Sequence, residues 1–182
     1  MSNNLLVTTA LQQTWDTNKH MIFLGKWCQK YNNFESLNNK NYEISNYHWD
    51  NRQKLIEDYN YLNQLYKNLL KHLTQDLNKY HNLDFSERYW KIIIGPWLIT
   101  FIQITFERYE NLKNLFKNYT VDETILLDIN YKQLIPENFE KFTRLITTDT
   151  WNHYIYNSIL NFNKFEFQIN KNFRNFINEE KF

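Results

Sequence analysis

The feature that most constrains the fold is a long run of apolar residues spaced three and four positions apart. That spacing places the apolar side chains on one face of an α-helix, with polar residues on the opposite face. It predicts an amphipathic helix from about Asp50 to Tyr80, with Asp50 as its N-cap. The apolar positions are Leu55, Tyr59, Leu62, Tyr66, Leu69, Leu70, Leu73 and Leu77.

A second helical pattern begins at Asp84 or Ser86 and contains the most apolar run of the chain, Ile92 to Phe106. Pro96 lies inside this run, so it either opens a fresh helix or kinks a continuous one. The run is shorter than the roughly 20 residues of a membrane-spanning helix, and polar residues interrupt it. Its apolar side chains surround the helix axis. This pattern favours a buried, central helix over a membrane segment.

Three short apolar runs without helical period are typical of buried strands, and they cover residues 5–10, 21–25 and 124–129. The segment between the first two runs is a short helix or a loop. The polar stretch 29–49 is best interpreted as an ordered loop or a short pair of strands.

Two shorter helices are predicted in the second half of the chain. One begins at Pro136 and ends near Ile146. The other follows Thr148 or Asp149, either of which is a suitable N-cap. Strands separated by helices predict a helix-rich α/β fold, a three-layer sandwich with a small parallel sheet. We expect one N-terminal α/β domain over residues 1–160 and a poorly patterned tail over residues 161–182.

Composition excludes several classes of function. A net charge of +1 and an isoelectric point of about 7.8 give no field that would recruit nucleic acid. The single Cys28 excludes an internal disulfide framework and a paired-cysteine zinc site. Two glycines in the whole chain exclude both glycine-rich phosphate-binding motifs. The N-terminus lacks the pattern of a signal peptide, and we expect neither a metal ion nor a cofactor.

The first candidate binding residues are Lys26 and Trp27, directly after the second predicted strand. Ligands of open α/β sheets bind beyond the carboxyl ends of the strands. Lys26 could meet a phosphate there, and Trp27 could stack on a base or sugar ring. The alternative is a strand-end turn with a packed tryptophan and a solvated lysine. That alternative is favoured on the residues alone.

The stretch "HWDNR", residues 48–52, offers both chemistry and structure. His48 and Asp50 could form a proton-transfer pair. In the structural interpretation, Asp50 caps the following helix, Trp49 packs it to the core and Arg52 pairs with a nearby carboxylate. The structural interpretation is favoured by the residues alone.

Two further clusters carry candidate ligand-binding groups. Arg88 and Lys91 share a helix face beside Trp90, where they could hold an anion. Asn152 and His153 lie at the start of a predicted helix. A lone histidine in such a place is more often structural than catalytic.

An ordered set of motifs resembles the N-terminal region of a family of bacterial transferases encoded in O-antigen and other surface-polysaccharide biosynthesis regions. The similarity covers roughly residues 5 to 160, and no single motif is specific. The motifs are "LLVTTALQQTW", "IFLGKWC", "YHWDNR", "DYNYLNQLY", "LN..H", "RYWKIIIGPWL", "ERY" and "WNHYIY".

The resemblance implies a cytoplasmic enzyme that handles an activated sugar or another phosphate-bearing precursor. By extension, we expect half of a two-domain, glycosyltransferase-like architecture, with a separate C-terminal half as a partner. The alternative is a non-catalytic partner module or a truncated fragment, and a sulfo- or phosphotransferase also stays open. No nucleic-acid partner and no membrane span are expected.

The family offers no established catalytic residues that can be carried over, so the site is predicted from the residues above. His48 or Asp50 would be the base that deprotonates an acceptor hydroxyl, and Arg52 or Arg88 would neutralise the leaving phosphate. The residues expected to line a substrate site are Lys26, Trp27, Arg52, Arg88, Trp90, Asn152 and His153.

Overall fold

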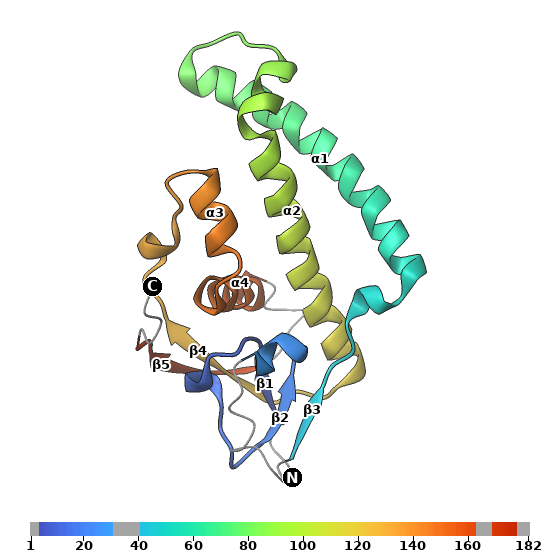
Figure 1. The fold of residues 1–182 in the computed structure, drawn as a ribbon, viewed down its shortest axis with the longest axis vertical. Coiled ribbons are helices and arrows are strands. Elements are labelled where there is room, and N and C mark those ends of the chain that lie inside the picture. The colour runs from blue at the N-terminus through green and yellow to red at the C-terminus, as the bar shows by residue number, and fades with distance from the viewer. Residues whose placement is uncertain (1–3, 31–40, 163–168, 178–182) are drawn as a thin grey trace. The chain divides into compact units, whose positions relative to one another are not determined.

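A computed structural model describes residues 4–30, 41–162 and 169–177 of the chain (Figure 1). It confirms the predicted helix-rich α/β class with a parallel sheet. The chain divides into two compact units. The sheet unit comprises residues 1–47 and 111–182, and the hairpin unit comprises residues 48–110.

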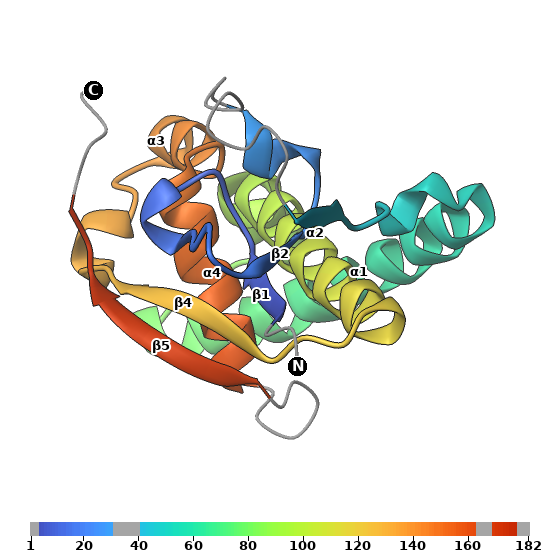
Figure 2. The same cartoon turned by 90° about the horizontal axis from the view of Figure 1, so that it is seen from below.

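Five parallel strands form the sheet, in the order β3-β2-β1-β4-β5. The inner strands are the three that the apolar runs predicted, and their side chains are almost entirely buried. Figure 2 shows β4 and β5 side by side, as their register requires. The strands are β1 (Asn4–Val7), β2 (His20–Phe23), β3 (Tyr42–Ile44), β4 (Glu123–Asp128) and β5 (Asn170–Asn175).

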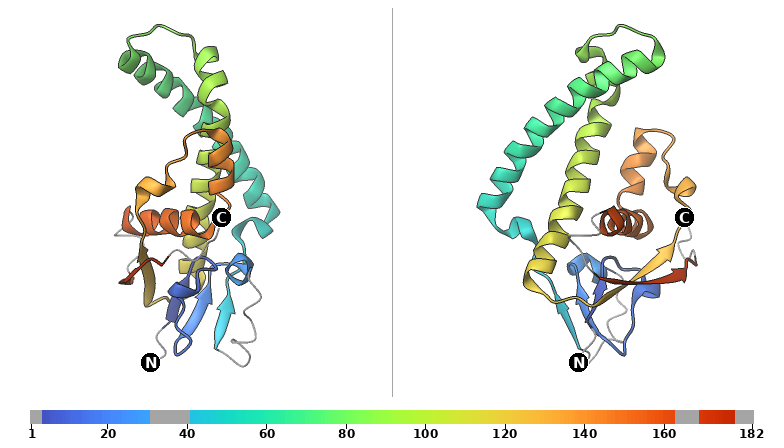
Figure 3. Two further views of the ribbon diagram at one scale, coloured as in Figure 1. Left: turned by 60° about the vertical axis from the view of Figure 1, so that its left-hand side comes forward. Right: turned by 180° about the vertical axis from the view of Figure 1, so that it is seen from behind.

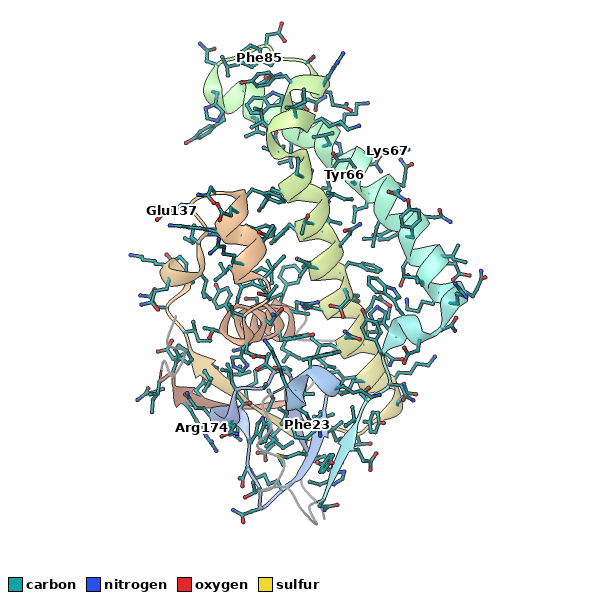
Figure 4. The ribbon with its side chains drawn as sticks, in the orientation of Figure 1. Phe23, Tyr66, Lys67, Phe85, Glu137 and Arg174 are labelled. Atoms are coloured by element: carbon teal, nitrogen blue, oxygen red, sulfur yellow. The ribbon has the colours of Figure 1, made fainter. Side chains whose placement is uncertain are left out.

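Both edge strands were missing from the three predicted strands. β3 lies inside the stretch expected to be a loop or a strand pair, and β5 lies inside the expected tail. β5 pairs with β4 along its whole length, and Arg174, labelled in Figure 4, donates from Nη1 to the Gln13 carbonyl at 2.9 Å. Both strands are polar, with most side chains exposed or half-buried, and therefore lack the apolar signal of an inner strand.

The helices of the sheet unit begin at side-chain caps. α4 (Asp149–Phe162) begins after Thr148, whose hydroxyl accepts from the Trp151 N–H at 3.3 Å, so the predicted cap is confirmed. α3 (Phe139–Leu145) begins later than Pro136, because Asn138 is its N-cap. Short 3-10 helices follow β1, β2 and β4, and they are η1 (Gln12–Thr14), η2 (Lys26–Gln29) and η5 (Tyr131–Leu134).

The hairpin unit consists of α1 (Arg52–His81) and most of α2 (Glu87–Asn118), which run as two antiparallel arms (Figure 3). The long helix predicted from periodicity is confirmed, but its predicted cap is wrong. Asn51 is the N-cap and accepts from the Lys54 N–H at 3.1 Å, while Asp50 lies in the short helix η4 (His48–Asp50). Buried residues from both arms form the core of the hairpin unit. They are Leu62, Leu70, Leu98 and Ile102.

α2 runs continuously through Pro96, so this proline does not open a new helix. At the neighbouring Gly95, a Cβ atom would lie 2.8 Å from the hydroxyl of Tyr66, which Figure 4 labels on α1. The absence of a side chain at Gly95 thus allows the two arms to approach closely.

The expectation that α2 is a buried, central helix is wrong. Ile92 and Ile93 are 69% and 58% exposed, and only 22% of the helix's most apolar stretch is buried. Within this unit α1 covers one side of α2, so apolar side chains on its other faces stay exposed. By length and composition alone α2 is able to cross a membrane.

Candidate functional site

The strand order places a topological switch point between β1 and β4. From β1 the chain builds outward through β2 to β3, and it later returns to add β4 and β5 on the other side. In open parallel sheets, ligands bind beyond the carboxyl ends of the strands at such a point. The residues that follow β1 here are Thr8, Thr9 and Ala10, and all three are buried.

His153 on α4 joins the two strands that flank the switch point. Its Nε2 accepts from the Leu127 N–H of β4 at 3.1 Å, so the proton of the neutral ring belongs on Nδ1. That nitrogen lies 3.5 Å from the Thr8 hydroxyl, which follows β1. His153 is 1% exposed, and burial lowers its pKa from 6.5 to about 4. The geometry makes His153 a neutral anchor between α4 and the sheet.

Asp149, the first residue of α4, connects this helix to the loop after β1. Its Oδ1 accepts from the Ala10 N–H at 3.1 Å, and the side chain is buried. Its second oxygen, Oδ2, is also buried and has no hydrogen-bond partner among the described residues. Thr9 and Thr150 are the sequence neighbours of the two bonded residues, and their hydroxyls lack described partners as well. We call Thr9, Ala10, Asp149 and Thr150 the β1–α4 junction.

The segment after β2 is bonded to Thr8, the first residue after β1. The indole N–H of Trp27 donates to the Thr8 carbonyl at 3.0 Å, and the Trp27 ring lies against Gly25. A Cβ atom at Gly25 would be 2.2 Å from that ring, which explains why glycine stands here although the backbone is extended. Lys26 is exposed, and Trp27 is half-buried. Lys26 is therefore accessible to a ligand at this edge.

Cys28 is a structural residue of this edge. It is fully buried, and its thiol lies 3.5 Å from the Val7 carbonyl. Desolvation by burial raises the pKa of the thiol to about 12. A thiol of this kind is protonated at neutral pH, so Cys28 is a poor nucleophile.

The "HWDNR" stretch enters the hairpin unit. His48 is buried and its ring stands 4.8 Å from that of Trp49, whereas Asp50 and Arg52 are exposed. Trp49 packs against the hairpin core, as the structural interpretation expected. The expected ion pair of Arg52 is wrong for the part of the chain that the structure describes, because no carboxylate there lies within ion-pair distance.

Trp49 also leads to a charged network at the base of the hairpin. Its indole N–H donates to Asp58 Oδ2 at 2.8 Å. The Lys54 ammonium lies 2.9 Å from the same oxygen and 2.7 Å from Glu110 Oε2. Desolvation opposes the charge on Lys54, but the bonds to Glu110 and Asp58 hold its pKa above the ordinary value. Both oxygens of Asp58 are engaged, since Oδ1 also accepts from Lys54 at 3.1 Å.

Arg88 and Trp90 lie at the far end of the hairpin from Arg52. Trp90 is buried and donates from its indole to Asn78 Oδ1 at 2.8 Å, while Arg88 is exposed. Arg52 is the first residue of α1, a helix of 30 residues, and Arg88 lies in the first turn of α2, the arm that returns. A helix of that length spans about 45 Å. One phosphate therefore cannot contact both arginines.

The predicted site residues thus fall into separate places. Trp27 and His153 both contact Thr8 in the sheet unit, and Lys26 directly precedes Trp27. Asn152 closes the turn before α4, donating to the Ile146 and Thr148 carbonyls at 3.0 and 2.7 Å. His48, Asp50, Arg52, Arg88 and Trp90 belong to the hairpin unit.

The residues of the β1–α4 junction were missed as site residues. Thr9 stood inside a run assigned to a strand, and Asp149 was considered only as a helix cap. The signal available was the polar pair Thr8-Thr9 at the end of an apolar run. Among residues 4–30, 41–162 and 169–177, no group of three potential metal-ligating side chains comes together.

The model of the "LIC12162 family transferase" matches residues 4–181, almost the whole chain. No curated protein and no solved structure matches the chain.

Proposed function

We propose, from the premise that the chain belongs to the LIC12162 family of transferases, that it binds an activated sugar or related phosphate-bearing precursor for glycosyl transfer. We further propose a cytoplasmic role in surface-polysaccharide assembly. The observation that carries the proposal is the set of buried polar groups at the switch point of a parallel sheet. Such a switch point is where open α/β sheets bind their ligands.

Glycosyl transfer requires a cation near the leaving phosphate and a base near the acceptor hydroxyl. Lys26 is an exposed cation directly before Trp27, whose indole bonds the residue that follows β1, so Lys26 is our candidate for the phosphate. His153 is a poor base, because burial keeps its pKa near 4 and its Nε2 is occupied by the Leu127 N–H. His48 and Asp50 as the base, and Arg52 or Arg88 as the anion-binding group, stay predictions.

A second candidate function is that of a module completed by a separate catalytic half. The observation that favours it is the exposed apolar surface of α2, which includes Tyr89, Ile92 and Ile93. A partner would cover such side chains. Transfer activity that appears only on mixing with a separate protein from the same biosynthetic region would support this function, whereas activity of the chain alone would contradict it.

Thermal-shift screening of the whole chain against nucleotide sugars and nucleoside diphosphates tests the main proposal. A ligand at a hundredfold excess over its dissociation constant stabilises by about 2.7 kcal/mol. In a protein of this size that corresponds to a rise in melting temperature of about 5 °C or more. Lys26→Met should weaken the shift. Lys67→Met, which removes an exposed lysine of α1, should leave it unchanged. A chain that melts cooperatively but responds to no ligand would contradict the proposal.

A further inference from the structure

The β1–α4 junction holds three buried oxygen atoms whose hydrogen bonding is incomplete. Thr9 is 1% exposed, Asp149 7% and Thr150 8%. Thr9 Oγ1, Thr150 Oγ1 and Asp149 Oδ2 have no partner in the described part of the chain. A buried polar atom without a partner costs about 1–3 kcal/mol. Three of them on adjoining residues need a reason beyond stability.

These atoms lie on residues that one hydrogen bond links. Thr9 neighbours Ala10, and Thr150 neighbours Asp149, in the sequence. The hydrogen bond from the Ala10 N–H to Asp149 Oδ1 joins the two dipeptides. The bond also fixes the carboxylate, so that its second oxygen is the one left for a ligand. Oδ1 is structural, and Oδ2 is available.

The chemistry of the junction selects among ligands. A helix N-terminus ordinarily attracts an anion. Here the first residue of the helix is itself a carboxylate, which accepts hydrogen bonds and repels a phosphate. The two threonine hydroxyls both donate and accept. One carboxylate oxygen and two threonine hydroxyls on linked residues suit neighbouring hydroxyl groups of a ligand, each of which donates one hydrogen bond and accepts another.

We propose that the β1–α4 junction binds hydroxyl groups of a sugar ring. The inference rests on the proposed function and deepens it, because it assigns a part of the activated precursor to named residues. The ring is either the sugar to be transferred or the ribose of its nucleotide. The phosphate of the same ligand lies away from Asp149. Because the three oxygens are buried, binding requires neighbouring groups to shift and admit the ring.

Three single substitutions separate a ligand role from a structural one. In Asp149→Asn the amide oxygen keeps the bond from the Ala10 N–H, and an NH₂ group replaces the available oxygen. Thr9→Val removes an unpartnered hydroxyl without changing the side-chain shape. The matched control is Thr124→Val on β4. That equally buried hydroxyl is already engaged, since it donates to the Leu6 carbonyl at 3.1 Å.

The experiment is isothermal titration of the whole chain and these variants. The probes are UDP-glucose and GDP-mannose, the diphosphates UDP and GDP, the 2′-deoxy analogue dUDP, and methyl α-D-glucoside and methyl α-D-mannoside. We expect Asp149→Asn and Thr9→Val to weaken binding of a nucleotide sugar at least tenfold. Thr124→Val should leave the dissociation constant unchanged. Thermal melts would establish that each variant is folded.

The pattern across the probes identifies the ring. If the transferred sugar occupies the junction, the variants weaken binding of the nucleotide sugars but not of the diphosphates. If the ribose occupies it, they weaken binding of the diphosphates too, and dUDP binds less tightly than UDP. Either pattern supports the inference.

Other outcomes separate the inference from the proposed function. Equal nucleotide-sugar affinity in the wild type and all variants overturns the inference and leaves the function intact. Binding of a methyl glycoside that depends on Asp149, without binding of any nucleotide sugar, supports the inference and overturns the function. If no probe binds the wild-type chain, both are overturned.

Discussion

Two buried aspartates, one in each unit, have opposite surroundings. Asp58 in the hairpin is 8% exposed, and both of its oxygens accept hydrogen bonds, from Trp49 and Lys54. Asp149 at the sheet edge is 7% exposed, yet only one of its oxygens has a partner among the described residues. Burial alone therefore does not distinguish the two side chains. Their hydrogen bonding does.

The difference indicates different roles. A buried carboxylate whose oxygens are both bonded holds its neighbours in place, and its removal leaves them without partners. A buried carboxylate with an available oxygen reduces stability, and proteins keep such groups mainly at functional sites. Asp58 is accordingly a structural residue. Asp149 belongs to the candidate site.

The largest effect should come from breaking the paired region. Lys54→Met removes the cation that Asp58 and Glu110 share, so two buried carboxylates lose an opposite charge. We expect the free energy of unfolding to fall by about 3 kcal/mol, at the low end for a buried pair because the Lys54 side chain is 33% exposed. Urea denaturation measures the change. Lys67→Met on the same helix is the control and should cost less than about 0.5 kcal/mol.

The next effect is a dependence of stability on pH, through His153. Its folded-state pKa of about 4 lies below the ordinary 6.5, so the unfolded chain takes up the proton first. The contribution of neutral His153 to stability is complete above pH 6.5 and is lost as the pH falls from 6.5 toward 4. Between pH 7.5 and pH 5, His153 should lower the free energy of unfolding by about 2 kcal/mol.

Urea denaturation at both pH values, in the wild type and in His153→Gln, isolates this contribution. The free energy of unfolding should fall between pH 7.5 and pH 5 by about 2 kcal/mol less in the variant than in the wild type. His72→Gln, at an exposed position of α1, should keep the wild-type dependence. If the stability of His153→Gln depends on pH as that of the wild type does, His153 is not kept neutral in the folded protein.

A smaller effect is expected for Thr124→Val. The substitution removes a buried hydroxyl that donates to the Leu6 carbonyl, and it leaves that acceptor without this bond. The loss should be about 1 kcal/mol, measured by chemical denaturation. No loss would indicate that the bond contributes nothing, and Thr124 would then no longer serve as a reference for Thr9.

The smallest effect, and the one of opposite sign, is expected for Thr9→Val. Because its hydroxyl has no partner in the described chain, a methyl group in its place should leave stability unchanged or raise it by up to about 1 kcal/mol. The same denaturation series would show it. A loss equal to that of Thr124→Val would mean that the Thr9 hydroxyl is bonded after all and would weaken the comparison.

Much of the fold was predictable, because strong local patterns specify it. The three- and four-residue spacing of α1 and the apolar runs of the inner strands each carry a clear signal. β3 and β5 were not predictable in the same way, since polar edge strands have no such pattern. The cap of α1 was misassigned by one residue, because Asp50 and Asn51 are adjacent and both residue types cap helices well.

The candidate site was less predictable, because it depends on contacts between distant parts of the chain. Ala10 and Asp149 are brought together only by the placement of α4 against β1 and β4. Nothing in the sequence near either residue reveals which oxygens remain without partners. Clusters such as "HWDNR" attracted attention because several functional residue types stand side by side. In the structure Trp49 of that cluster serves the hairpin core.

The most direct test of this account is the stability of Asp58→Asn beside that of Asp149→Asn, in the absence of ligand. In Asp58→Asn either orientation of the amide turns its NH₂ group toward a donor, so stability should fall by about 2 kcal/mol. In Asp149→Asn the bond from Ala10 survives, and stability should change by less than about 1 kcal/mol. Equal losses in the two variants would contradict the distinction between a structural aspartate and one retained for a ligand.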